Sequence, residues 1–175
     1  MRVLIESLLP RLFPWLEFLC VTHEGKQDLD KSIPRKLRGW KVPGDRFVIV
    51  RDNDGGDCRL LKQRIALTCR EAGRGDTLIR LPCQELEAWY FGDPSAVARA
   101  YEMPKLEARI AEAAGLYADE IFKPSTRLKE ILPEFQKISG ARRIAPHLSL
   151  EENGSRSFHA FIEGIRRIAG APENE

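Results

Sequence analysis

The segment over residues 47–57 constrains the fold of this chain more than any other part of the sequence. Its apolar run predicts a strand over Arg46–Arg51, and the near absence of polar residues is typical of a strand covered on both faces. Asp57 is a suitable N-cap for a helix over Cys58–Ala72, which Gly73 would close. A strand that leads directly into a helix is half of a βαβ unit, so the segment favours a parallel sheet.

The rest of the chain alternates in the same way before it becomes helical. Leucines near helical period predict a first helix, and apolar residues at i, i+4 and i+8 predict a second. Asp93 and Pro94 together predict the start of a later helix, as its cap and its first residue. Further strands are expected over Leu16–Val21 and Thr77–Leu81, and helices over Met1–Phe13, Lys26–Leu37, Glu85–Phe91, Lys105–Ala114, Ser125–Leu132 and Ser155–Ala169.

This order of elements predicts a single α/β domain over residues 1–175. A Rossmann-like parallel sheet with crossover helices is expected in 1–93, followed by a mostly helical extension in 94–175. A helix is expected before the first of these strands, and the family resemblance given below implies that the first strand of the sheet is missing. Ligands of such sheets bind beyond the carboxyl ends of the strands, where Asp52, Asp54 and Glu85 are expected.

The acidic turn after the strand predicts a metal site. If extended geometry continued through Asn53, Asp52 and Asp54 would share a face, and a divalent cation such as Mg²⁺ or Mn²⁺ would relieve their repulsion. The structural alternative is a turn and a helix cap, which is the expected role of Asp57. An EF-hand does not fit, because its twelfth loop position is Gln63.

Further charged groups follow the later strand. Glu85 or Glu87 could join the metal site, or could complement the dipole of a helix start. Basic and hydroxyl groups near expected helix starts suit phosphate oxygens, or form a solvated surface with serine caps. These groups lie in Lys123–Ser125, Gln136–Arg143 and Ser155–Phe158.

Composition excludes several classes of protein. The net charge of +2 is too small to identify a nucleic-acid-binding protein by itself. The four cysteines show no C-x-x-C spacing, which disfavours structural zinc and fits a reduced, cytoplasmic location. The apolar start contains Glu6, Pro10 and Arg11 and is not expected to be a signal peptide, and no run is long enough to span a membrane. The three histidines form no catalytic triad pattern.

The chain resembles an uncharacterised bacterial family whose members look like Toprim domains, the metal-binding fold of topoisomerases, primases and OLD-type nucleases. The stretches that carry this resemblance run through most of the chain in order. They are Glu24–Leu29, Val50–Asp54 with Cys58 and Leu61-Lys62, Glu85–Trp89 with Asp93, Lys123–Ser125, Gln136-Lys137, Ser139–Arg142 and Ser157-Phe158.

The resemblance implies a specific division of roles. Asp52 and Asp54 match the D-x-D pair that holds Mg²⁺, and Glu85 or Glu87 would extend it. The glutamate that ends the first strand of the family pattern has no counterpart, unless Arg2–Ile5 were a strand that places Glu6 there. The remaining roles implied are catalysis by Glu85, Lys137 and Arg142, and substrate binding by Lys62, Lys123, Ser125, Lys137, Arg142 and Ser157.

Two functions are therefore predicted. The first is a Mg²⁺- or Mn²⁺-dependent nuclease or related phosphoryl-transfer protein acting on nucleic acid, in a bacterial defence or mobile-element module. The alternative is a non-catalytic Toprim-like subunit that binds a partner such as an ATPase, which the missing first-strand glutamate favours.

Overall fold

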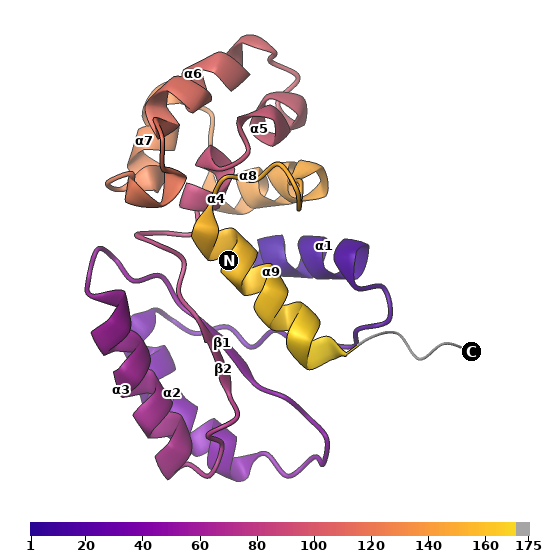
Figure 1. Cartoon of the computed structure of the whole chain (residues 1–175), viewed down its shortest axis with the longest axis vertical. Helices are drawn as coiled ribbons and strands as arrows, with labels where there is room; N and C mark the ends of the chain where they lie inside the picture. The colour runs from indigo at the N-terminus through magenta and orange to yellow at the C-terminus, as the bar shows by residue number, and fades with distance from the viewer. Residues whose placement is uncertain (171–175) are drawn as a thin grey trace.

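The structure is a computed structural model that describes residues 1–170, and within them it is mostly helical. Helices surround one short pair of strands (Figure 1). The elements in order are α1 (Arg2–Leu12), α2 (Lys26–Gly39), β1 (Val48–Val50), α3 (Cys58–Glu71), β2 (Leu78–Arg80), α4 (Ala88–Phe91), α5 (Pro94–Ala100), α6 (Lys105–Ala114), the 3-10 turn η1 (Ala118–Glu120), α7 (Pro124–Ile131), α8 (Lys137–Ile144), the 3-10 turn η2 (Ala145–His147) and α9 (Arg156–Ala169).

The predicted strand–helix–strand unit is confirmed. β1 and β2 pair in parallel, with Ile49 opposite Ile79, and α3 forms the crossover between them. These two isoleucines pack with buried side chains of α2 and α3. α2 and α3 lie on one side of the strand pair and α9 on the other (Figure 1). The pair is thus covered on both faces, as the apolar sequence of β1 predicts.

The larger sheet that the sequence predicts is not confirmed. The expected strand over Leu16–Val21 is wrong, because no strand forms there and the only sheet within residues 1–170 is the β1–β2 pair. Leu16 and Cys20 contact the main core, but Leu19 is 73% exposed. An apolar segment becomes a strand only where a neighbouring strand accepts and donates its backbone hydrogen bonds, and a Toprim-like sheet is therefore not established.

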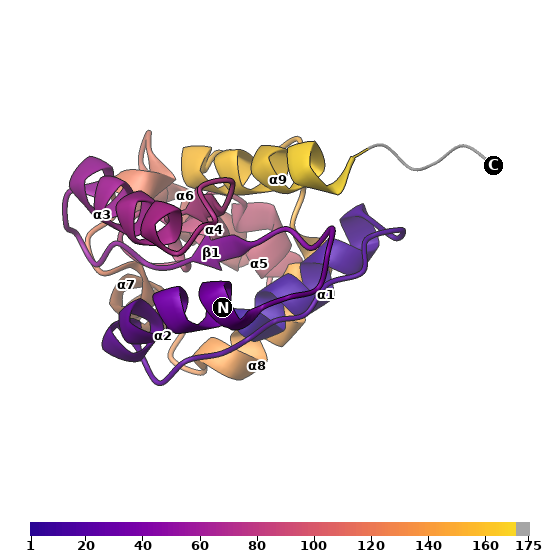
Figure 2. The ribbon, with the colours of Figure 1, turned by 90° about the horizontal axis from the view of Figure 1, so that it is seen from below.

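The main hydrophobic core lies among the helices. The largest buried side chains include Trp89, Tyr90, Phe91, Phe158 and Phe161, which bring α4 and α9 together. α1 packs against α8 and η2, so this core combines elements from both sides of residue 93. In the view from below, α9 and α1 lie on opposite sides of β1 (Figure 2).

Local signals position the helix starts. Asp57 caps α3 by accepting the N–H groups of Arg59 and Leu60, and Asp93 caps α5, in which Pro94 is the first residue. Both caps are confirmed as predicted.

The helix α8 was not among the expected elements, and it approaches the core closely at Gly140. A Cβ atom at Gly140 would collide with the ring of Phe135. The absence of a side chain at this position therefore sets how near α8 lies to the helical core.

Candidate functional site

The loop after β1 is fastened to the connection between β2 and α4. The N–H of Asn53 donates to the Pro82 carbonyl over 3.3 Å, and that of Asp54 donates to the Gln84 carbonyl over 2.9 Å. The side chain of Asn53 accepts the N–H of Gln84 and donates to the sulfur of Cys58. The loop and the connection are therefore held as one unit.

Two residues of this unit have unusual backbone geometry. Asp54 and Gln84 adopt left-handed conformations, with φ of 50° and 60°. Non-glycine residues rarely take this geometry, and such strain is frequent at functional sites. The extended geometry needed to bring Asp52 and Asp54 onto one face therefore ends before Asp54. The Asp54 carboxylate instead lies 3.0 Å from the ammonium of Lys26.

Asp52 points toward the start of the α4 region and is half-buried. Its Oδ1 accepts the N–H of Leu86 over 3.0 Å. Burial, and next the charge of Glu87, raise the pKa of Asp52 to about 7. At neutral pH this carboxyl group therefore exchanges a proton readily, which is a property of catalytic acids and bases.

Glu85 and Glu87 face the ammonium of Lys137, which begins α8. Nζ of Lys137 lies 3.2 Å from Glu85 Oε1 and 3.8 Å from Glu87 Oε1. Burial lowers the pKa of Lys137, but the charges of Glu87 and Glu85 outweigh it and raise the pKa. We call Asp52, Glu85, Glu87 and Lys137 the acidic cluster.

The two glutamates of the acidic cluster differ in their environment. Burial raises the pKa of Glu87, and the charge of Lys137 opposes the rise only in part. For Glu85, burial acts in the same direction, but hydrogen bonds from Ser125 and the charge of Lys137 outweigh it and lower the pKa. The N–H of Ser125, at the start of α7, donates to Glu85 over 2.9 Å. Glu85 is therefore stabilised as a carboxylate, whereas the surroundings of Glu87 and Asp52 disfavour their charged forms.

Tyr90 adds a polar group that the sequence analysis missed. Its side chain is buried, and its hydroxyl has no hydrogen-bond partner within the described part of the chain. Burial, followed by the charges of Glu87 and other neighbours that include Asp52, raises its pKa well above the ordinary value. Nothing in its sequence position, among apolar neighbours of α4, distinguishes it from a core residue.

A cavity of about 360 Å³ adjoins the acidic cluster. It shares Lys137 with the cluster, and the other residues that line it are Ser125, Thr126, Lys129, Glu130, Phe135 and Gln136. Hydroxyl, amide and ammonium groups at the starts of two helices suit phosphate oxygens.

The acidic cluster has oxygen donors of the type that Mg²⁺ and Mn²⁺ use. Within residues 1–170, however, no group of three or more carboxylate, histidine or cysteine side chains is arranged to hold a metal ion. The ammonium of Lys137 supplies the positive charge instead. Metal binding by Asp52, Glu85 and Glu87 would require Lys137 to move aside, and Asp54 to leave Lys26 if it also took part.

The other predicted site residues are dispersed. Lys62 on α3 and Arg142 on α8 are exposed, and the ammonium of Lys123 lies 5.2 Å from the centre of the Phe122 ring. Ser157 donates to Asp119 and accepts from the indole of Trp89, so its hydroxyl is already used within the fold. The structure thus brings together Asp52, Glu85, Glu87, Ser125 and Lys137 from the predicted set.

The geometry defines a small, mainly helical protein with a cluster of carboxylates and an ammonium at the end of a parallel strand pair. The chain belongs to the family described as Domain of unknown function (DUF4276), which it matches over residues 2–166. This description names no activity and no link to Toprim domains. Comparison with curated proteins and with solved structures gave no match. In addition, no helix within residues 1–170 has the length and apolar composition needed to cross a membrane.

Proposed function

We propose that this protein is a Mg²⁺- or Mn²⁺-dependent nuclease, or a related phosphoryl-transfer protein, that acts on nucleic acid. The acidic cluster carries the proposal, because Glu85 and Glu87 share one ammonium, Asp52 faces Glu87, and a cavity lies beside them. Two left-handed residues in the facing loops are further support, since strain of this kind is frequent where a loop is held for a function.

Each residue of the cluster has a role in this proposal. Asp52 and Glu87 hold the cation, with Glu85 and Asp54 as further ligands, and Lys137 turns to a phosphate oxygen of the substrate. Arg142 and the groups around the cavity, with Lys62 and Lys123, would contact the sugar–phosphate backbone. A divalent cation bound there would neutralise the phosphate and activate a water molecule. Before the cation binds, Asp52 can hold or release a proton near neutral pH, because its pKa in the metal-free site is about 7.

The resemblance described above supports a biological setting for this activity. We propose a cytoplasmic protein of a bacterial defence or mobile-element module that works beside an ATPase. The Toprim-like fold is part of the same proposal, and the parallel unit β1–α3–β2 with Asp52 just beyond it supports the fold.

The proposal is tested by cleavage of labelled DNA and RNA, single- and double-stranded, with millimolar Mg²⁺ or Mn²⁺. Asp52→Asn keeps the shape of the side chain and should lower the rate at least about a hundredfold. Asp76→Asn is the matched control, because Asp76 is an exposed carboxylate paired with Arg46, and these two residues precede β2 and β1, whereas the cluster follows the strands. Full activity of the Asp52 variant, or an equal loss in the control, would contradict the proposal.

A second function is favoured by one observation. Lys137 already neutralises Glu85 and Glu87, and no group suited to a metal ion is formed within residues 1–170. Such a cluster suits a non-catalytic subunit that keeps the scaffold and binds a partner such as an ATPase. Calorimetry distinguishes the two functions: heat of Mn²⁺ or Mg²⁺ binding that Asp52→Asn removes supports the enzyme, and no binding at millimolar metal supports the subunit.

A further inference from the structure

A row of positive charges follows one side of α2 and continues into the loop after it. Lys31, Arg35 and Arg38 lie four and three residues apart, which places them along one stripe of the helix. Lys41 continues the spacing beyond the helix end. All four are exposed, and none belongs to an ion pair in the part of the chain that the structure describes. We call these four residues the basic row.

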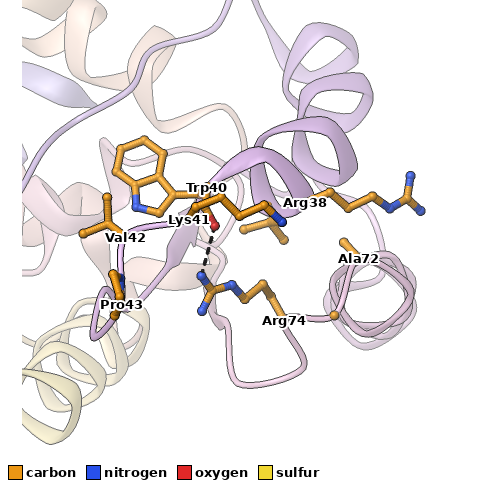
Figure 3. Close-up of a pocket in the computed structure, with 9 residues that line it drawn as sticks. Arg38, Trp40, Lys41, Val42, Pro43, Ala72 and Arg74 are labelled. Carbon is orange, nitrogen blue, oxygen red and sulfur yellow. Dashed lines mark hydrogen bonds between the residues drawn. The ribbon is translucent and has the colours of Figure 1, made fainter.

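The basic row ends in a cavity of about 400 Å³ (Figure 3). Arg38 and Lys41 line it together with Arg74, which comes from the loop after α3, and no carboxylate is among its lining residues. The guanidinium of Arg74 donates to the Trp40 carbonyl over 3.3 Å and lies 4.8 Å from the centre of the Phe47 ring. Arg74 is therefore held in place, whereas Arg38 and Lys41 have no side-chain hydrogen bond or ion pair with any of residues 1–170.

The two ends of α2 connect this cavity with the acidic cluster. At the start of α2, Lys26 is bound to Asp54, two residues from Asp52. At its end, Trp40 packs against Phe47, which directly precedes β1. From Lys26 to Arg38 the helix rises about 18 Å. α2 therefore runs from the loop that follows β1 to a cavity near the opposite end of β1, and the basic row lies along this helix.

Stabilisation of the helix dipole explains only part of the basic row. Arg38 complements the carboxyl end of the α2 dipole, as cations in a last turn commonly do. Lys31 and Arg35 lie too far from that end to benefit, and Lys41 lies beyond it. Two acids of the same helix are already occupied: Asp28 is bound by His23 and by the N–H of Glu24, and Asp30 pairs with Arg51 and Arg64. Positively charged side chains that line a concave surface repel one another, and an anion bound between them would relieve this repulsion.

We propose that the basic row and its cavity hold successive phosphates of a nucleic-acid strand whose reacting phosphate lies at the acidic cluster. This placement rests on the proposed function for its substrate. The recognition is of the sugar–phosphate backbone and not of bases, because the groups are ammonium and guanidinium ions along a helix side. The cavity accepts the phosphate farthest from the cluster.

The test is binding of fluorescently labelled single-stranded DNA and RNA in EDTA, where no cleavage occurs. The variant Arg38→Gln/Lys41→Gln should weaken binding about tenfold near physiological salt. It should also reduce the slope of log affinity against log salt by about 1.4, since each backbone contact to a single strand contributes about 0.7. Lys31→Gln/Arg35→Gln should behave similarly. Stronger loss with one nucleic acid identifies it as the preferred substrate.

The matched control is Lys105→Gln/Arg109→Gln on α6. These two residues are also exposed, lack ion pairs among residues 1–170 and change the net charge equally. Unchanged binding by the α2 variants, an equal loss in the α6 control, or no binding by the wild-type protein would overturn the inference. A wild-type protein that binds through the basic row but does not cleave with Mg²⁺ would contradict only the proposed function.

Discussion

The side chains of Asp93 and Asp52 both point into the protein, but their surroundings are opposite. Asp93 is buried and accepts three hydrogen bonds, from the N–H groups of Ala96 and Ser149 and the hydroxyl of Ser95. Asp52 accepts one, from the N–H of Leu86, and it faces Glu87. The first carboxylate stabilises the fold through its donors, whereas the second is held where its charge is unfavourable. A buried charge without sufficient partners is a common property of functional sites.

Replacing Asp93 should have the largest effect on stability. Asp93→Ala leaves two buried N–H groups without an acceptor and removes the cap of α5, which should lower the free energy of unfolding by about 3 kcal/mol. Urea unfolding followed by circular dichroism measures the change. Asp76→Ala, which removes an exposed carboxylate, serves as the control and should cost less than about 1 kcal/mol. Equal stability of the two variants would show that Asp93 and its donors do not stabilise the fold.

The pH dependence of stability should show the opposite behaviour of Asp52. Because its pKa is raised to about 7 in the folded protein, the folded state keeps a proton that the unfolded chain releases above about pH 4. The free energy of unfolding should therefore fall as pH rises from about 4 to about 7. The difference between these two pKa values corresponds to about 4 kcal/mol, which solvent screening of the half-buried carboxyl group reduces to roughly 2 kcal/mol.

Asp52→Asn isolates this contribution. In EDTA the variant should lack that part of the pH dependence and be more stable than the wild-type protein at pH 8 by roughly 2 kcal/mol. Thermal or urea unfolding at several pH values provides the measurement. Parallel stability curves of the two proteins would mean that Asp52 ionises normally, and the contrast with Asp93 would disappear.

Replacing Lys137 should change the affinity of the acidic cluster for metal ions, an effect not expected at the hydrogen-bonded Asp93. Lys137→Gln removes the ammonium that neutralises Glu85 and Glu87, so Mn²⁺ should bind about tenfold more tightly, as expected for one nearby charge at the protein surface. Lys129→Gln is the control, because Lys129 lines the same cavity but pairs with no carboxylate within residues 1–170. Calorimetry that finds equal affinities would show that Lys137 does not compete with the cation.

The parts of the fold that sequence could predict are those set by neighbours in the chain. Asp57 and Asp93 cap their helices through N–H groups two or three residues away, so a short sequence pattern is sufficient. The apolar run before Asp52 likewise predicts β1 with its partner across α3. The strand expected over Leu16–Val21 does not form, because a strand depends on a partner that may lie anywhere in the chain.

The contacts of the candidate site join residues that are far apart in the chain, so the sequence alone could not predict them. Lys137 reaches Glu85 across 52 residues, and only a family resemblance could associate them in advance. Tyr90 could not be distinguished from its apolar neighbours, since burial of its hydroxyl near Glu87 is a tertiary effect. The turn at Asp54 depends on the opposing turn at Gln84, which the local sequence does not specify.

Gly140 has a consequence beyond the packing of α8. Lys137 stands three residues before it, one turn earlier on the same helix, so the gap between Gly140 and Phe135 also fixes how far the ammonium reaches toward Glu85 and Glu87. An added methyl group at Gly140 would collide with the Phe135 ring, and any shift of α8 that relieved the collision would carry the ammonium with it. The absence of a Cβ atom at Gly140 thus affects how strongly the ammonium of Lys137 neutralises Glu85 and Glu87.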